Sequence, residues 1–184
     1  MIIAIDGNHN VGKTTLVDGL KEYYESNKNV LFIKFPTHNY IGDFARQNVD
    51  KECADVISLL FCADYYKVFN DVISHNTDKI IILDRYILTL FALQGYMKDK
   101  NYEFLYHVCE KLPFPDVQIV IRKMSAGSDS GVEDSYVETL NEIPFSDKMG
   151  KVHIVDNIIS GSAQKNLDGF NEVVRIIDSC IKVK

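Results

Sequence analysis

The sequence predicts an α/β protein with a five-stranded parallel sheet and helices on both faces. Five short runs rich in isoleucine and valine alternate with segments whose apolar residues recur at helical spacing. Continuous apolar runs are typical of strands that are buried on both faces of a sheet. The alternation indicates βαβ units, because parallel neighbours need a crossover connection. The strands are expected at MIIAID (1–6), VLFIKF (30–35), KIIILD (79–84), DVQIVIR (116–122) and KVHIVD (151–156).

One domain is expected over residues 1–184, since this length and a hydrophobic content of 46% suffice for one full core. A polar, acidic segment, Met124–Ser135, follows the fourth strand. It is either a solvated loop or a short lid, near residues 123–136, that closes over a ligand. The helices are expected over residues ~13–26, ~52–75, ~87–110 with a break near Lys98, and ~164–182.

The composition limits the partners of this chain. A net charge of -6 and a pI near 5.3 argue against binding of nucleic acid polymers, which requires many lysine and arginine contacts. No apolar stretch approaches the roughly 20 residues of a membrane span, and no signal segment precedes the first strand. We therefore expect a soluble, cytoplasmic protein without a membrane or nucleic acid partner. The cysteines form no CxxC pair and are typical of reduced thiols: Cys53, Cys62, Cys109 and Cys180.

The segment GNHNVGKTT, residues 7–15, follows the first strand directly and matches the pattern GxxxxGK[ST]. The two glycines allow a turn whose backbone N–H groups surround a phosphate at the start of the next helix. Lys13 would reach the outer phosphates, and the Thr14 hydroxyl would bind Mg²⁺. A chance glycine-rich turn is the alternative, but the strand before and the helix after are the context that this mechanism needs. The predicted residues of this nucleotide-phosphate site, which the resemblance given below assigns to ATP, are Gly7, Asn10, Gly12, Lys13, Thr14 and Thr15.

Asp84 and Arg85 come directly at the end of the third strand. Because the carboxyl ends of parallel strands meet at one edge of the sheet, both should lie near the phosphate loop. A carboxylate there can hold magnesium, and a guanidinium can bridge donor and acceptor phosphates. We predict Lys13, Asp84 and Arg85 as catalytic residues and Thr14 and Asp84 as metal ligands. The alternative is a strand-end aspartate beside an arginine in a surface ion pair.

A succession of motifs resembles the thymidylate kinase family from residue 1 to about residue 122. The motifs are AIDGNHNVGKTT, KFPTHNYIGDFAR, LLFCADYYKVF, LDRYILTLFALQGY and PFPDVQIVI. The resemblance implies a single-domain P-loop kinase fold that transfers the terminal phosphoryl group of ATP to dTMP with Mg²⁺. It also implies that FPTHNYIG shapes the monophosphate site, that Phe61 stacks on the base, and that Thr89 and Gln94 line the base pocket. Family members commonly pair through helices beside the sheet, so SLLFCADYYKVF serves either a homodimer or the core.

Phe61 and Tyr65 are four residues apart on a predicted helix, so both can face one cleft. With hydroxyl and amide groups opposite, they would form a pyrimidine pocket, and the alternative is that both are core aromatics. We expect activity on dTMP and dUMP, or a 5-substituted relative, because such a pocket separates one methyl group weakly. The predicted substrate-binding residues are His9, Phe35, Pro36, His38, Phe61, Tyr65, Arg85, Thr89 and Gln94.

Several positions depart from the family pattern. Thr37 and His38 stand where an arginine usually grips the acceptor phosphate, and His9 stands where an acid usually touches the sugar hydroxyl. Tyr65 replaces the usual base-reading arginine, and Leu93 replaces an aromatic residue near the sugar. These departures all concern residues that contact the acceptor, whereas the residues expected to bind the phosphate donor match the family pattern.

Two other functions are open on the sequence. The loop with its histidine also resembles deoxynucleoside kinases, which place a general base at the end of the second strand. Here no acid follows that strand until Asp43, which favours a monophosphate acceptor, whose attacking oxygen is already anionic. A non-catalytic nucleotide-binding module is the other alternative, because most of the family's acceptor-site arginines are missing. Lys13, Thr14, Asp84 and Arg85 favour the kinase over such a module.

Overall fold

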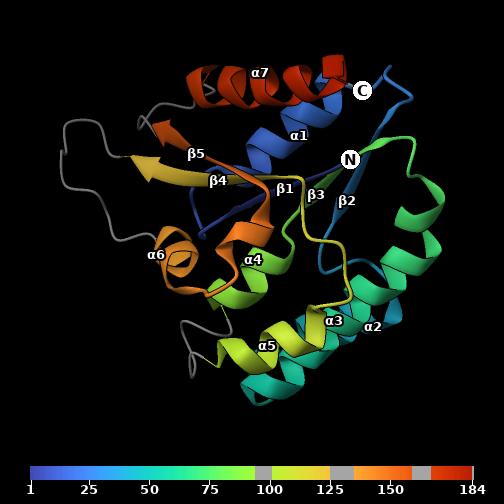
Figure 1. Cartoon of the computed structure of the whole chain (residues 1–184), viewed down its shortest axis with the longest axis vertical. Helices are drawn as coiled ribbons and strands as arrows, with labels where there is room; N and C mark the ends of the chain where they lie inside the picture. Colours follow the sequence, from blue (N-terminus) through green and yellow to red (C-terminus); the bar gives the residue numbers. More distant parts are fainter. Residues whose placement is uncertain (94–100, 125–134, 159–166, 184) are drawn as a thin grey trace.

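The computed structural model of this chain describes residues 1–93, 101–124, 135–158 and 167–183 (Figure 1). All five predicted strands form, and they build one sheet in the order β2-β3-β1-β4-β5 with parallel neighbours throughout. The predicted α/β class and the five-stranded parallel sheet are therefore confirmed. The strands are β1 (Ile2–Gly7), β2 (Val30–Lys34), β3 (Ile80–Asp84), β4 (Val117–Met124) and β5 (Lys151–Ile158).

Burial differs between the centre and the edges of the sheet. Every residue of β1 and β3 is buried, as the continuous apolar runs predicted. The expectation of burial on both faces is wrong for the two edge strands. β2 is mostly half-buried, and Val152 and Ile154 of β5 are 39% and 42% exposed. The helices pack over the central strands, so the outer strands are covered less completely.

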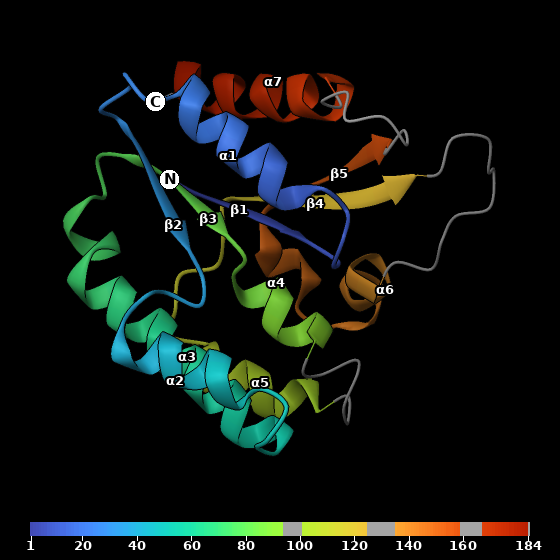
Figure 2. The same cartoon turned by 180° about the vertical axis from the view of Figure 1, so that it is seen from behind.

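One face of the sheet is covered by α1 (Lys13–Tyr23) and α7 (Leu167–Val183), which lie side by side in Figures 1 and 2. Leu16 and Leu20 of α1, together with Val173 and Ile177 of α7, belong to one buried cluster with the sheet's isoleucines and valines. These apolar side chains recur three or four positions apart, so each helix presents one stripe to the strands. This packing fixes the start of α1, where the phosphate loop ends.

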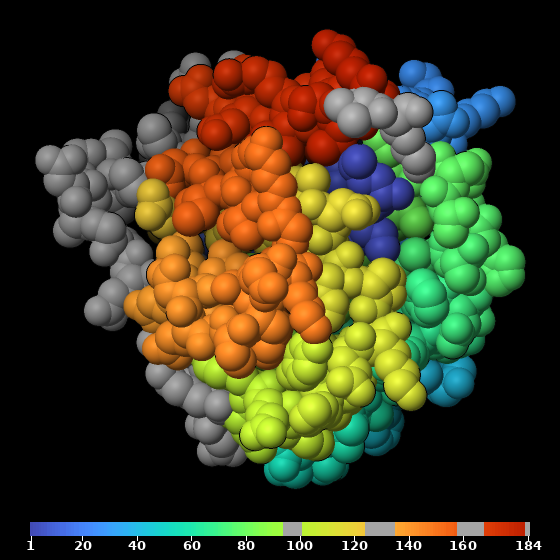
Figure 3. Space-filling view, viewed as in Figure 1, coloured from blue at the N-terminus to red at the C-terminus, as the bar shows by residue number. Residues whose placement is uncertain are grey.

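The opposite face is covered by α3 (Ala54–Asp71), α4 (Ile87–Leu90) and α5 (Tyr102–Cys109). Their core is rich in aromatic rings, among them Phe35, Tyr65, Tyr86 and Phe91. The short turns η1 (Ile73–His75) and η3 (Ser146–Met149) close connections on this side. In Figure 3 the orange segment that includes α6 (Ser135–Glu142) and β5 fills the middle of the surface, between α7 above and α5 below.

Two helices were not predicted. The first, α2 (Tyr40–Asn48), begins at Asn39, whose side-chain oxygen accepts hydrogen bonds from the backbone N–H groups of Ile41 and Gly42. This N-cap was overlooked because the FPTHNYIG motif was interpreted only as a substrate loop. The second is α6, which begins at the end of the predicted lid. Most of that lid (125–134) and the predicted break near Lys98 lie outside the described residues.

None of the helices described here is long and apolar enough to cross a membrane. The four cysteines are free, with Cys62 and Cys109 buried in the aromatic-rich core and Cys53 exposed. Burial raises the pKa of the Cys109 thiol to about 12, so this thiol stays protonated at neutral pH. These two buried cysteines therefore act as small apolar core residues.

Candidate active site

The site lies where three neighbouring strands end. The phosphate loop follows β1, and the Phe35–His38 segment follows β2. Asp84 is the last residue of β3, and Arg85 comes directly after it. The strand register places Asp84 beside both Ile5 and Lys34. Because these strands are parallel and adjacent, their carboxyl ends bring the predicted donor and acceptor segments to one edge of the sheet.

The phosphate loop surrounds an open pocket of about 290 Å³. Two residues of the loop have left-handed backbone conformations, Asn10 with φ 60° and Gly12 with φ 80°. The left-handed conformation favours glycine here, and a Cβ atom at Gly12 would also require the Asn157 side chain of β5 to shift. The pocket is lined by Asn8, His9, Asn10, Val11, Gly12, Lys13, Thr14, Thr15 and Arg85.

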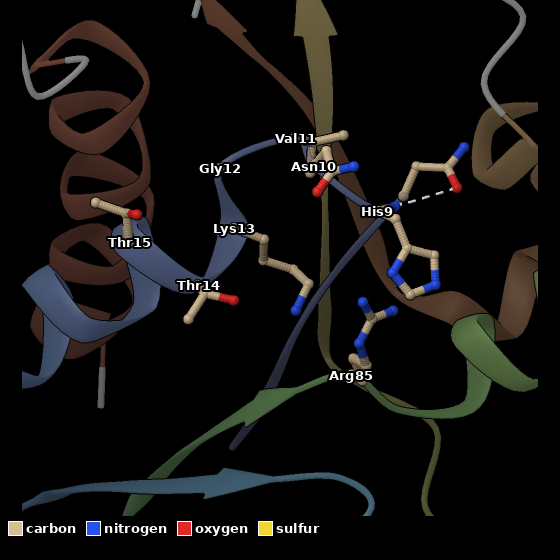
Figure 4. A pocket seen from close by; sticks show the side chains of 9 residues that line it. His9, Asn10, Val11, Gly12, Lys13, Thr14, Thr15 and Arg85 are labelled. Carbon is tan, nitrogen blue, oxygen red and sulfur yellow. Dashed lines mark hydrogen bonds between the residues drawn. The ribbon is translucent and has the colours of Figure 1, made fainter. Parts of the chain in front are cut away.

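The predicted ATP-binding residues other than Gly7 therefore share one pocket. Gly7 lies at the end of β1, where its carbonyl accepts a hydrogen bond from Arg85 at 3.5 Å. In Figure 4 the side chains of Lys13 and Arg85 extend into the space between the loop and the end of β3. Two cations, one at the start of α1 and one directly after β3, thus line one cavity at the phosphate loop, which is an arrangement that suits a polyphosphate.

Lys13 and Asp84 form a buried ion pair beneath this pocket. The two residues are 5% and 2% exposed, and the Lys13 ammonium donates a hydrogen bond to the Asp84 carboxylate. The Lys34 ammonium lies 3.8 Å from the other carboxylate oxygen. Burial lowers the pKa of Lys13, and the neighbouring Arg85 charge lowers it further, while Asp84 acts in the opposite direction. A bound phosphate would add negative charge and favour the ammonium form.

Arg85 adopts a left-handed backbone conformation, with φ 68°. This region is unfavourable for a residue with a side chain and persists only where its surroundings fix it. The Arg85 N–H donates to the Ile5 carbonyl at 3.0 Å, and the next N–H, that of Tyr86, donates to the Asp6 carboxylate at 3.1 Å. Strand β1 thus holds the chain on both sides of Arg85 and directs its side chain to the pocket.

Asp6 was not predicted as a site residue, although it is a fully buried carboxylate next to the phosphate loop. It accepts hydrogen bonds from the Tyr86 N–H, the Thr89 hydroxyl and, at 3.0 Å, the Gln118 side-chain amide. Its position at the carboxyl end of the central strand was the available signal. Tyr136 of α6 was also missed, and it contacts Arg85 and Thr89 at 3.1 and 3.2 Å.

The predicted acceptor-phosphate segment is held by a second buried carboxylate. Asp64 of α3 is fully buried and accepts hydrogen bonds from the Thr37 N–H at 2.7 Å and the Thr37 hydroxyl at 2.5 Å. The Asn39 amide donates to the same carboxylate at 2.7 Å. These bonds hold Phe35, Pro36 and His38 in place from one side, because they fix the residues that follow the FP pair.

Arg46 of α2 holds the segment from the other side. Its guanidinium donates to the carbonyls of Pro36 and Thr37, the latter at 2.9 Å, and lies 3.2 Å from His38 Nδ1. It also pairs with Asp43. The side chain of His38 is 90% exposed. A guanidinium therefore stands next to the position where the family pattern has its arginine, although it comes from a different element.

The residues predicted to bind the base differ in their surroundings. Phe61 is partly buried against the core. Tyr65 is only 2% exposed, and its hydroxyl donates a hydrogen bond to the Tyr86 carbonyl at 3.1 Å. The Tyr65 ring packs edge-on to Phe35, with 4.7 Å between centroids. Thr89 is 5% exposed, and its hydroxyl is bonded to Asp6. For Tyr65, the alternative of a core aromatic residue therefore fits better than a place in the wall of a pocket. Gln94 lies outside the described residues.

A strand, a glycine-rich loop with its lysine, and an aspartate–arginine pair on the neighbouring strand define a P-loop nucleotide-binding protein of the parallel α/β class. Residues 5–126 match the family model for thymidylate kinase, which is more than half of the chain. The protein belongs to the thymidylate kinase family, as the succession of motifs predicted.

Curated relatives agree with this assignment. The chain is 32% identical over 111 residues to the thymidylate kinase of Acholeplasma laidlawii, covering 57% of this chain and 55% of that one. It is 30% identical over 130 residues to the probable thymidylate kinase of Methanosphaera stadtmanae, covering 66% of each. The matched part thus spans between 55% and 66% of the length of these two relatives.

Two solved structures share the fold. The thymidylate kinase of Ehrlichia chaffeensis has a TM-score of 0.71 at 20% identity, over 96% of this chain and 98% of that chain. The thymidylate kinase of Candida albicans, whose structure is reported as revealing the origin of broad substrate specificity, has a TM-score of 0.71 at 18% identity. That match covers all of this chain and 93% of the other. At these identities the likeness establishes the arrangement of the elements.

Proposed function

We propose that this protein transfers the γ-phosphoryl group of ATP to a deoxynucleoside monophosphate, with dTMP as the expected acceptor and dUMP or a 5-substituted relative close behind. The observation that carries the proposal is the pocket of the phosphate loop, which Lys13 and Arg85 both line in a member of the thymidylate kinase family. The donor phosphates would bind to the loop N–H groups. Lys13 would move from Asp84 toward the outer phosphates as their charge enters the pocket.

Mg²⁺ is proposed as the metal, held by the Thr14 hydroxyl and the Asp84 carboxylate. Both are oxygen ligands, and a magnesium ion bound with ATP needs only one or two protein ligands beside phosphates and water. The described residues contain no cluster of three or more histidine, cysteine, aspartate or glutamate side chains that could hold a metal by themselves. This fits a metal that arrives with the nucleotide. When bound, it would neutralise charge on the phosphates of ATP.

The acceptor phosphate is proposed to bind beside Pro36 and His38, with Arg46 adding positive charge and Arg85 between the two substrates. An anionic oxygen of the monophosphate attacks the γ-phosphorus, a new P–O bond forms, and the bond to the β-phosphate oxygen breaks. The products are the nucleoside diphosphate and ADP. No general base is needed, because the attacking oxygen carries no proton at neutral pH. Arg85 would stabilise the charge that moves between the phosphates.

The end of β2 supports a monophosphate over a free nucleoside as acceptor. β2 ends at Lys34, and the following residues to Thr37 carry no carboxylate that could serve as a general base. Asp43, the first acid after this strand, is paired with Arg46 on α2. The deoxynucleoside kinase alternative is therefore not favoured. A non-catalytic module is also less well supported, because all four donor-side residues are present and assembled.

The base is proposed to stack on Phe61, which is partly buried at the rim of the core. Tyr65 and Thr89 would support this pocket from behind, and Gln94 is proposed to bond the edge of the pyrimidine. His9 lines the phosphate pocket and is proposed to face the sugar of the acceptor. Discrimination by such a pocket amounts to about 1–3 kcal/mol for one methyl group, so dTMP and dUMP should differ by less than about two orders of magnitude.

The test is ADP release in the presence of ATP and Mg²⁺ with dTMP, dUMP, dCMP, dGMP, dAMP and thymidine as acceptors. We expect turnover that depends on the acceptor, the highest kcat/KM with dTMP or dUMP, and no phosphorylation of thymidine. Lys13→Ala should lose this turnover, and Lys21→Ala is its matched control, because Lys21 lies on the same helix and pairs with exposed Asp18. Preference for thymidine would establish the nucleoside kinase instead, and ATP binding without turnover would establish a binding module.

We also propose a homodimer formed through α2 and α3. Tyr40 and Phe44 of α2 are 76% and 51% exposed, and Leu59 of α3 is 48% exposed, so large apolar side chains face solvent on two helices that contact each other. Light scattering should give twice the monomer mass, reduced to the monomer mass by Phe44→Glu. A cytoplasmic location is proposed because the core thiols Cys62 and Cys109 are free, as in a reducing compartment.

A further inference from the structure

Tyr136 connects α6 to Arg85 of the candidate active site. It is fully buried on α6, and its hydroxyl accepts a hydrogen bond from Arg85 Nη1 at 3.1 Å. The same hydroxyl lies 3.2 Å from the Thr89 hydroxyl. Among the described residues, the other hydrogen bond of the Arg85 guanidinium goes to a backbone group, the Gly7 carbonyl, at 3.5 Å. Tyr136 is therefore the side chain that holds this guanidinium.

The direction of each hydrogen bond in this chain can be deduced. The Thr89 hydroxyl has one hydrogen, which it donates to the Asp6 carboxylate. Its oxygen can then only accept from Tyr136, so the Tyr136 hydrogen points to Thr89. The Tyr136 oxygen in turn accepts the hydrogen bond from Arg85. The chain runs from a cation to a buried carboxylate, with each donor polarised toward the negative end.

The hydrogen bonds of Arg85 leave two nitrogens of its guanidinium group available. Both protein acceptors contact Nη1, while Nη2 and Nε make no hydrogen bond to the described residues. Arg85 also lines the phosphate pocket, where Figure 4 shows its guanidinium directed toward the loop. Because hydrogen bonds to Nη1 fix the plane of the guanidinium, Nη2 and Nε are oriented in advance as a pair of donors to a phosphate.

We propose that Tyr136 is a positioning residue that orients the Arg85 guanidinium toward the transferring phosphoryl group through the chain Arg85–Tyr136–Thr89–Asp6. The proposal rests on the phosphoryl transfer proposed above. Tyr136 acts through Arg85 and contacts no substrate itself. The hydroxyl is the essential group, because the ring alone would keep the packing of α6 against Leu88, Ala92 and Val120.

The test is a double-mutant cycle measured with ATP and dTMP. Tyr136→Phe should lower kcat by about tenfold or more, as expected for loss of one hydrogen bond to a charged group that acts in the transition state. The KM for ATP should stay within about twofold. In the Arg85→Ala background the same substitution should lower kcat no further, because the group that it orients is gone. Tyr102→Phe is the matched control, since that hydroxyl contacts Glu142 at the surface.

A second variant guards against misfolding. Thr89→Ala breaks the same chain one link further on and should show the same pattern in both backgrounds. Equal losses with and without Arg85 would overturn the proposal, because Tyr136 would then act on the fold alone. An unchanged kcat in Tyr136→Phe beside an active wild type would overturn it as well, while leaving the proposed function standing. A wild type without acceptor-dependent turnover would overturn both.

Discussion

The ammonium group of Lys13 donates a hydrogen bond to the carboxylate of Asp84, and both groups are almost completely buried. This pairing joins the first residue of α1 to the last residue of β3. A buried pair is costly to break from one side, because the remaining charge loses its compensation. The residue that is proposed to neutralise the charge of ATP therefore also compensates the buried charge of Asp84.

Lys13→Ala should reduce phosphoryl transfer by about 10²-fold or more, because a charge that stabilises the transferring phosphates is lost. It should also lower the melting temperature, with Lys34, 3.8 Å from Asp84, limiting the loss. Steady-state kinetics and thermal unfolding would measure the two effects, with Lys21→Ala as the control on the same helix. Turnover close to that of the wild type would contradict the assignment of the phosphate loop.

Arg85→Ala should lower kcat far more than it weakens ATP binding, since Arg85 is proposed to act mainly in the transition state. Arg85→Gly should be equally inactive but more stable than Arg85→Ala by about 1 kcal/mol, because glycine adopts φ 68° without strain. Kinetics, ATP titration and chemical denaturation separate these effects. A large loss of ATP affinity with an unchanged rate would exclude the proposed role.

Asp64→Asn should raise the KM for the monophosphate while leaving the KM for ATP unchanged. The neutral amide keeps the size of the side chain. However, its nitrogen replaces one carboxylate oxygen and cannot accept the hydrogen bonds that fix Thr37 and Asn39. Asp71→Asn on the same helix is the control, because Asp71 is exposed and pairs with Lys67. A rise in the KM for ATP instead would show that this segment does not form the acceptor side.

Stability should fall as the pH rises above about 10, the ordinary pKa of tyrosine. Burial raises the pKa of Tyr136 to about 12 and that of Tyr65 well above its usual value. Between the unfolded and the folded pKa, unfolded tyrosines release protons while folded ones keep them, so the free energy of unfolding decreases with pH. Urea denaturation at pH 9 and pH 11 would measure the slope. Tyr65→Phe should make the slope shallower, and an unchanged slope would contradict the shift.

The sequence by itself determined the sheet and the position of the glycine-rich loop at the end of its central strand. Continuous apolar runs mark buried strands wherever they occur, and a parallel sheet brings their carboxyl ends together. The glycine pattern after β1 and the Asp84–Arg85 pair at the end of β3 were therefore sufficient to predict that the loop and Arg85 lie at one pocket. These are local signals, because each depends on residues next to one another in the chain.

Only the tertiary structure decided which distant residues support these groups. Tyr136 lies 51 residues from Arg85, and Asp64 lies 27 residues from Thr37, so no local pattern links either pair. The same holds for Tyr65, whose helical spacing suited a pocket until packing against Phe35 and the Tyr86 carbonyl placed it in the core. The hydrophobic period tells which face of a helix turns inward. Whether that face meets a ligand or another ring depends on how the helices pack across the sheet.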